Sequence, residues 1–412
     1  MTVSDLQRWC IAHRIRIIQC AAVVLILATP HRLVVGFSRL LLDRPPVPAI
    51  DLKLRYIEVQ TWFPKEIPQE TMRRGAYPPA SYVILWPFLG WLTLTSAQWL
   101  WAVLMIVTLG WLAYVLLHES YAETLWERLF VGVLPFAMYA TSVAIGNGQL
   151  VIPVLSALVT GLVLLLDKRQ GWPTDVFAGV LILLALVSPT IAAPFFWLVL
   201  FVPRTFWPAA LIALGYGALT LLAVSSQKRD LVSSLLRWHA RAEAGVLWGA
   251  PRGGYANLHS WLIAVGLEEW NRSASLLVLG ALGVWVYYHR RGDLWCLLGV
   301  TALVARLWTY HRLYDDFLLV LPAIALFRIV KQSSATDNNG MIAGVLLVAI
   351  WVAVLSPPRL LLFPPPWNWL FQVEQLVVWG TVLIFLLKRA SASSVSLRPG
   401  YPLVPRTHGK AL

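Results

Sequence analysis

Hydrophobic residues occur along this chain in long unbroken blocks that alternate with short polar segments. The blocks run to roughly 15–25 residues, the length of helix needed to cross ~30 Å of hydrocarbon. Only helices and closed barrels satisfy their backbone groups in lipid, and continuous blocks are typical of helices. We therefore expect twelve membrane spans, at residues 17–37, 80–95, 97–117, 129–145, 150–166, 175–202, 208–224, 272–288, 294–310, 315–330, 340–356 and 370–387.

The composition agrees with a lipid environment. Hydrophobic residues make up 58% of the chain and charged residues 13%, whereas a soluble domain carries about 25% charged residues. We predict an all-α integral membrane protein, with one polytopic domain at residues 1–390 and a disordered cytoplasmic tail at 391–412. Three cysteines imply no disulfide framework. The first block is followed by His31 and Arg32 rather than by small residues, which indicates an uncleaved anchor.

Lysine and arginine in short loops predict the orientation of the chain. Both chain ends are basic, as are the loops "HRRGD" at 289–293 and "KQSSATDNNG" at 331–340. Placing all four in the cytoplasm agrees with an even number of spans between each pair. The external loops then fall at about 38–79 and 225–271.

One basic loop, "DKRQG" at 167–171, does not fit twelve simple spans, because they place it outside. An alternative makes 80–95 re-entrant and splits 175–202 at Ser188-Pro189. This topology puts "DKRQG" inside and "GNGQ" at 146–149 outside. The sequence leaves both topologies open.

The formal net charge of +13 points away from nucleic acid, because the basic residues lie between hydrophobic spans and not on one soluble domain. Membrane lipids with anionic headgroups, or a substrate that bears phosphate, are better partners. Arg237, His239 and Arg241 lie in the second external loop. They form either solvated loop charge or a site for an anion at the membrane surface, and we favour the second interpretation slightly.

The first external loop carries the candidate chemistry. Asp51 lies near the end of the first span, and Glu58 shares its face if the segment is helical. An enzyme that uses a lipid-linked substrate needs a carboxylate near the headgroups to deprotonate an acceptor hydroxyl. The alternatives are that Asp51 caps a helix and that Glu58 is a solvated helix residue.

Four segments together resemble a known family. Asp51 and Tyr56 are followed by Tyr77-Pro78-Pro79 at the entry to a hydrophobic block. Gly148-Gln149 heads another block, "LVSPTIAAPFFWLVL" occupies 186–200, and "WTYHRLYDDFLLVLPAIALF" occupies 308–327. These segments resemble the multi-spanning GT-C glycosyltransferases, and most of all glycosyltransferase family 87, the polyprenol-phosphate-sugar-dependent mannosyltransferases and their relatives. The family typically has Lys-Pro where this chain has Ser188-Pro189, so no lysine serves there.

The resemblance implies a GT-C bundle of about twelve transmembrane helices, with short amphipathic helices in the first external loop. It implies an inverting transfer of mannose or another hexose or pentose from a polyprenyl-phosphate donor to a lipid or glycan acceptor. Asp51 would be the general base. No cofactor is expected, and a requirement for a divalent metal is left open. The expected location is a prokaryotic plasma membrane, with the site on the extracytoplasmic face.

Around that base we expect a set of substrate-binding residues. Charge and topology point to basic side chains for the donor phosphate, and a buried arginine within a span is usually functional. Gln149 has an alternative as an interhelical hydrogen bonder. His311 and Arg312 could snorkel to the interface. Asp315 and Asp316 could cap a helix, pair with Arg312, pair with Arg306, or bind a metal. The expected substrate-binding residues are Tyr56, Glu58, Tyr77, Gln149, Arg237, His239, Arg241, Arg306, His311 and Arg312.

Two other functions remain open at this point. A lipid or solute transporter, or a flippase, would have inverted repeats and broken helices near the midplane. Ser188-Pro189 is one such break, but no matching break is visible in the other half of the sequence. A catalytically inactive GT-C-like scaffold is the second alternative.

Overall fold

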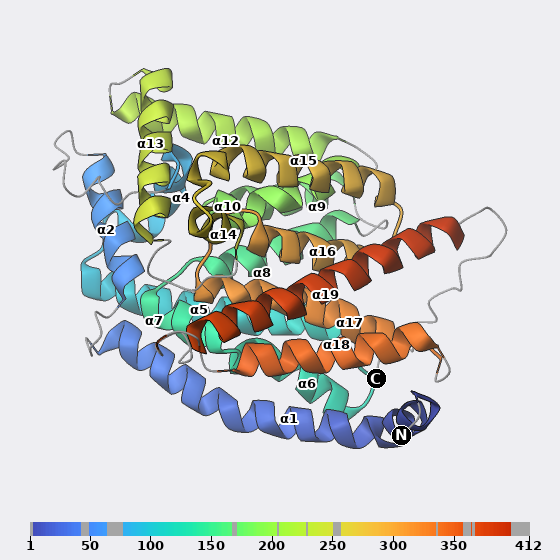
Figure 1. Ribbon diagram of the computed structural model, residues 1–412. Coiled ribbons are helices and arrows are strands. Elements are labelled where there is room, and N and C mark those ends of the chain that lie inside the picture. Colours follow the sequence, from blue (N-terminus) through green and yellow to red (C-terminus); the bar gives the residue numbers. More distant parts are fainter. Residues whose placement is uncertain are drawn as a thin grey trace.

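The computed structural model describes ten parts of the chain, and every regular element in them is a helix (Figure 1). The prediction of an all-α protein is therefore confirmed for these residues. The described parts are residues 3–42, 49–63, 77–166, 171–203, 206–227, 230–249, 257–334, 337–356, 364 and 367–396.

Five helices are long and apolar enough to cross a membrane. They are α1 (Val3–Leu41), α5 (Leu94–Glu119), α12 (Trp207–Ser226), α18 (Asn338–Leu355) and α19 (Trp367–Ser396). The pair α6 (Leu125–Ala137) and α7 (Tyr139–Asn147) makes a sixth, bent by 41°. The chain is thus a multi-pass membrane protein.

The remaining helices are shorter or less apolar. Those in the bundle are α8 (Val151–Leu166), α9 (Trp172–Ala185), α10 (Pro189–Ala192), η1 (Ala193–Phe195), α11 (Phe196–Phe201), α15 (Asn271–His289), α16 (Leu294–Leu307), η4 (Leu313–Leu319) and α17 (Val320–Gln332). Those near the ends of the long helices are α2 (Ile50–Trp62), α4 (Pro79–Leu89), α13 (Leu231–Gly249), α14 (Leu258–Ala264) and η3 (Glu268–Trp270) (Figure 1).

Helix α4 does not cross the bundle, so the simple span predicted at 80–95 is wrong. The side chain of Gln98, near the start of α5, donates to the carbonyl of Leu40 at the end of α1 over 2.9 Å. The chain therefore leaves α1 and enters α5 at the same end of the bundle. With 11 residues, α4 is only about 16 Å long, and the helix ends at Gly90.

The predicted span at 175–202 is divided in two. Helix α9 ends at Ala185 and α10 begins at Pro189, because proline suits a first helical turn but interrupts a continuous helix. The break lies beside α4, where the hydroxyl of Ser81 donates to the carbonyl of Val187 over 2.8 Å. These two features agree with the alternative arrangement, and "GNGQ" lies at the same end as α2, whereas α8 ends and α9 begins at the other end (Figure 1). Most of "DKRQG", residues 167–170, lies outside the described parts of the chain.

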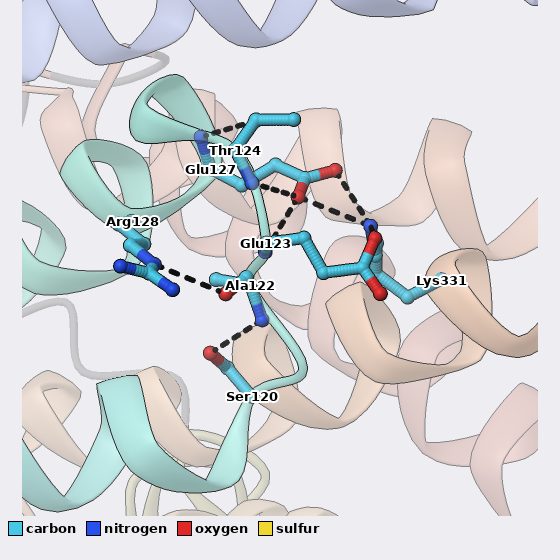
Figure 2. Close-up of polar contacts among 7 residues, drawn as sticks. All are labelled: Ser120, Ala122, Glu123, Thr124, Glu127, Arg128 and Lys331. Atoms are coloured by element: carbon cyan, nitrogen blue, oxygen red, sulfur yellow. Dashed lines mark hydrogen bonds and ion pairs between the residues drawn. The ribbon is translucent and has the colours of Figure 1, made fainter. Parts of the chain in front are cut away.

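The opposite end of the bundle is closed by a cluster that we call the clasp, formed by Glu123, Glu127 and Lys331 (Figure 2). The Lys331 ammonium lies 3.0 Å from both carboxylates. Glu127 also accepts from the backbone N–H of Glu123 and of Thr124, which caps α6. The clasp joins the end of α17 to the α5–α6 connection, far from α2.

Candidate functional site

The "GNGQ" turn holds the start of α2. Gly148 has φ +70°, a left-handed conformation that glycine adopts without strain, and it ends α7. The backbone N–H of Ala49 donates to the carbonyl of Gly146 over 3.1 Å. The side chain of Asn147 accepts from Arg39 of α1 over 3.0 Å. Three residues of the turn therefore position α2 against α1 and α7.

This docking brings Asp51 to Gln149, the fourth residue of the turn. The Gln149 side chain hydrogen-bonds the Asp51 carboxylate. The other feature of this carboxylate is that its Oδ2 atom is buried and has no hydrogen-bond partner. Burial raises the pKa of Asp51, while the Gln149 hydrogen bond and then the charge of Arg55 act in the opposite direction. Asp51 is thus a buried carboxylate with one oxygen that has no hydrogen-bond partner.

Two further charges lie on the same face of α2. Arg55 and Glu58 form an ion pair, and their side chains are only 8% and 4% exposed. The expectation that Glu58 shares a face with Asp51 is confirmed, whereas a solvated Glu58 is contradicted by its burial. Burial also raises the pKa of Glu58 to about 7, against the opposing charge of Arg55.

Tyr77 supports this face from the other side. The Arg55 guanidinium lies over the Tyr77 ring, with its central carbon 4.3 Å from the ring centroid. The Tyr77 hydroxyl hydrogen-bonds Ser188 at the break between α9 and α10, and burial raises its pKa to about 12. Pro78 and Pro79 then begin α4 in the way proline favours. Tyr77 therefore links α2 to the divided span.

The late aromatic and acidic segment completes the cluster. The charges of Arg312 and Asp315 both act on Asp51. Asp315 accepts from the backbone N–H of Arg312 over 2.9 Å and lies 3.1 Å from Nδ1 of His311. Asp315 thus caps η4, as one of the alternatives predicted, and the buried Nε2 of His311 has no hydrogen-bond partner.

The four segments that carry the family resemblance therefore meet at one end of the bundle. Asp51, Gln149, Tyr77 and Asp315 come from parts of the chain that are far apart in sequence. Ser188, which stands where the family has lysine, contributes a hydrogen bond to Tyr77 instead. Arg241 of α13 reaches this cluster too, because its charge acts on Glu58.

Other expected residues lie elsewhere. The Tyr56 hydroxyl donates to the carbonyl of Leu92 over 2.9 Å and braces the α4–α5 connection. Arg237 is exposed and bonds Ser233 of its own helix. His239 is half-buried on the same helix.

Arg306 lies in the core of the bundle and is fully buried. Its guanidinium pairs with Asp316, and the Tyr139 hydroxyl donates to the same carboxylate. The guanidinium also covers the ring of Trp379 at 4.8 Å. Arg306 is thus paired with Asp316, as one of the alternatives in the sequence analysis predicted.

Sequence reasoning missed Arg55 and Tyr82. Arg55 was one basic residue among several in a polar loop, although its spacing of four residues from Asp51 indicates a shared helix face. Tyr82 stacks on Trp62, with ring centroids 4.2 Å apart, and its hydroxyl lies close enough to Glu58 to influence that carboxyl. Nothing in the sequence distinguishes Tyr82 from other aromatic residues of the hydrophobic blocks.

Within the described parts of the chain, no group of three or more His, Cys, Asp or Glu residues is arranged to hold a metal ion. Comparison of the chain with protein-family models, with curated proteins and with solved structures finds no match.

Proposed function

We propose that this protein is an inverting glycosyltransferase of the GT-C type. It transfers a hexose or pentose, such as mannose, from a polyprenyl-phosphate donor to a lipid or glycan acceptor. The observation that carries the proposal is the environment of Asp51: a buried, unpartnered Oδ2 on a carboxylate oriented by Gln149. Its raised pKa strengthens the carboxylate as a general base.

In the proposed reaction Asp51 acts as the general base. Its carboxylate takes the proton of the acceptor hydroxyl, and the hydroxyl oxygen forms a bond to the anomeric carbon of the donor sugar. The bond from that carbon to the phosphate oxygen breaks, its electron pair leaves with polyprenyl phosphate, and the configuration inverts. Arg312 is close enough to act on Asp51, so its cation can stabilise the leaving phosphate beside the base.

The proposal extends to topology and location. A GT-C bundle of about twelve spans is supported by the helices that coincide with the hydrophobic blocks, once α4 is re-entrant and the span at 175–202 is divided. The Asp51 end then faces the extracytoplasmic side of a prokaryotic plasma membrane. The clasp end carries the basic loops and faces the cytoplasm.

A transfer assay in nanodiscs tests the proposal. Radiolabelled polyprenyl-phosphate sugars are offered together with a host lipid extract, to wild type and to Asp51→Asn. We expect label in a new product with wild type, and a loss of at least 10³-fold with Asp51→Asn, because the amide cannot take the proton. Full activity of Asp51→Asn would overturn the mechanism.

Glu127→Gln is the matched control, since it changes an ion-paired carboxyl to an amide at the clasp. It should transfer label like wild type. If wild type transfers no sugar from any donor but binds the labelled lipid, the result supports a transporter or an inactive scaffold instead.

A further inference from the structure

The face of α2 that carries Asp51 holds two carboxylates and one guanidinium. Asp51, Arg55 and Glu58 are spaced four and three residues apart, so they lie on one side of the helix. The side chains of Arg55 and Glu58 are almost fully buried and form an ion pair. The two carboxylates therefore compete for one guanidinium in a poorly solvated region.

Arg55 is within electrostatic reach of both carboxylates. Its charge acts on Asp51 as well as on Glu58. An acidic residue followed four positions later by a basic one is a favourable helical pair, so Asp51 and Arg55 could pair directly. In the structure they do not: Arg55 is paired with Glu58, and Oδ2 of Asp51 has no hydrogen-bond partner.

We infer that Glu58 is a positioning residue for Asp51: by holding Arg55, it prevents that guanidinium from closing on the Asp51 carboxylate and so leaves Oδ2 open to an acceptor hydroxyl. Tyr77 allows either pairing, because the Arg55 guanidinium lies on the Tyr77 ring and can turn over the ring without losing that contact. The inference rests on the proposed role of Asp51 as the base.

Other polar and charged groups surround Asp51, Arg55 and Glu58. Gln149 and then Arg312 and Asp315 face Asp51 from the α7–α8 turn and from η4. Arg241 of α13 and the hydroxyl of Tyr82 from α4 face Glu58. None of these groups is altered when Glu58 becomes glutamine, but the Glu58 charge also acts on Asp51 directly. The redirection of Arg55 is therefore read from a larger effect of Arg55→Met on Asp51 in the Glu58→Gln background than in wild type.

The first experiment measures Asp51 without using any substrate. Dicyclohexylcarbodiimide modifies protonated carboxyl groups in apolar surroundings, and mass spectrometry of the peptide reports the fraction of Asp51 that is modified at each pH. We expect the half-modification pH to fall by at least one unit in Glu58→Gln, because a guanidinium against Asp51 stabilises its ionised form. In Glu58→Gln/Arg55→Met the midpoint should return to the wild-type value or rise above it.

The second experiment is transfer at pH 8 with the polyprenyl-phosphate sugar that wild type uses. Glu58→Gln should lower kcat at least 10-fold, and adding Arg55→Met should restore it to within threefold of Arg55→Met alone. Restoration by removing a second charge is not expected if Glu58 only supports the fold. Equal kcat in wild type and Glu58→Gln, or no rescue by Arg55→Met, would overturn the inference.

The proposed transfer activity and the proposed role of Glu58 can be tested independently of each other. If wild type transfers no sugar, the labelling experiment still decides whether Glu58 controls Arg55. If Glu58→Gln does not fold, Glu58→Asp decides it: this side chain keeps the charge but is one methylene shorter and holds Arg55 less closely, so the half-modification pH of Asp51 should fall. An unchanged midpoint in Glu58→Asp, or an Asp51 that takes no label at any pH, would contradict the inference.

Discussion

Gly148 lies so close to Leu52 that a β-carbon on Gly148 would stand 2.4 Å from the β-carbon of Leu52. Two atoms cannot approach to this distance, so the turn before Gln149 and the first turn of α2 fit only because residue 148 has no side chain. The same residue has φ +70°. The position of Asp51 therefore depends on the absence of a side chain at residue 148.

Gly148→Ala should lower transfer at least 10-fold. The substitution adds left-handed strain of about 1–2 kcal/mol and forces α2 away from α7. Transfer and the thermal unfolding midpoint are measured together in nanodiscs. Gly110→Ala is the control, because nothing lies within 4 Å of a β-carbon at that position in α5. If Gly148→Ala behaves like Gly110→Ala, the close contact does not position Asp51.

Gln149→Leu should make Asp51 easier to protonate. The Gln149 hydrogen bond lowers the pKa of Asp51, so its loss moves the half-modification pH of Asp51 upward, by about one unit. Carbodiimide labelling measures the shift. Gln98→Leu removes a buried hydrogen bond to Leu40 and should leave the midpoint at Asp51 unchanged. A lower midpoint in Gln149→Leu would contradict the assigned contact.

Glu58 should make the protein less stable as the pH rises. Burial raises the pKa of this carboxyl from 4.5 to about 7, so the folded protein binds the proton more tightly than the unfolded chain. The stabilisation is fully present below pH 4.5 and is lost as the pH rises through 7. Across that interval it amounts to about 3 kcal/mol.

Thermal unfolding in detergent at several pH values checks this linkage. The midpoint of wild type should fall between pH 5 and pH 8, and that of Glu58→Gln should fall less, because glutamine does not titrate. The lower pKa expected for Asp51 in Glu58→Gln reduces the fall further, in the same direction. Identical slopes would show that Glu58 has an ordinary acidity.

Arg306→Met should destabilise the protein by about 3–5 kcal/mol, because it leaves the Asp316 carboxylate buried without its partner. Adding Asp316→Asn should recover part of that loss. Asp293→Asn is a contrasting variant: its pair with Arg328 spans 3.5 Å and Asp293 is 42% exposed, so the change should stay below about 1 kcal/mol. Equal losses in the two single variants would contradict a buried pair.

The sequence predicted the helical blocks well, because a hydrophobic block long enough to cross lipid has few other structures available to it. It left open whether residues 80–95 cross the bundle or are re-entrant. Residues 80–95 have the hydropathy of a span, and only a tertiary contact, Gln98 to Leu40, shows that the chain enters and leaves at one end. Hydropathy also left open which end of the bundle holds "GNGQ", and the hydrogen bond from Gln149 to Asp51 places it at the end that holds α2.

The sequence predicted only part of the candidate site. Asp51, Tyr77, Gln149, His311 and Arg312 could be named because they stand in short segments with unusual residue order. The burial of Arg55 and Glu58 could not, because a charged residue in a polar loop is usually solvated. Tyr77 and Arg241, which reach this face of α2 from elsewhere in the sequence, act on these two residues only in the folded chain.

The cluster around Asp51 also constrains how the protein is made. Asp51 and Asp315 are separated by about 260 residues, which a ribosome adds in roughly 13–50 s. Throughout this interval α2 lacks the segment that brings Arg312 and Asp315 to it. A nascent chain therefore carries an incomplete cluster, and the surroundings of Asp51 are complete only when synthesis has passed η4 and the late helices have formed.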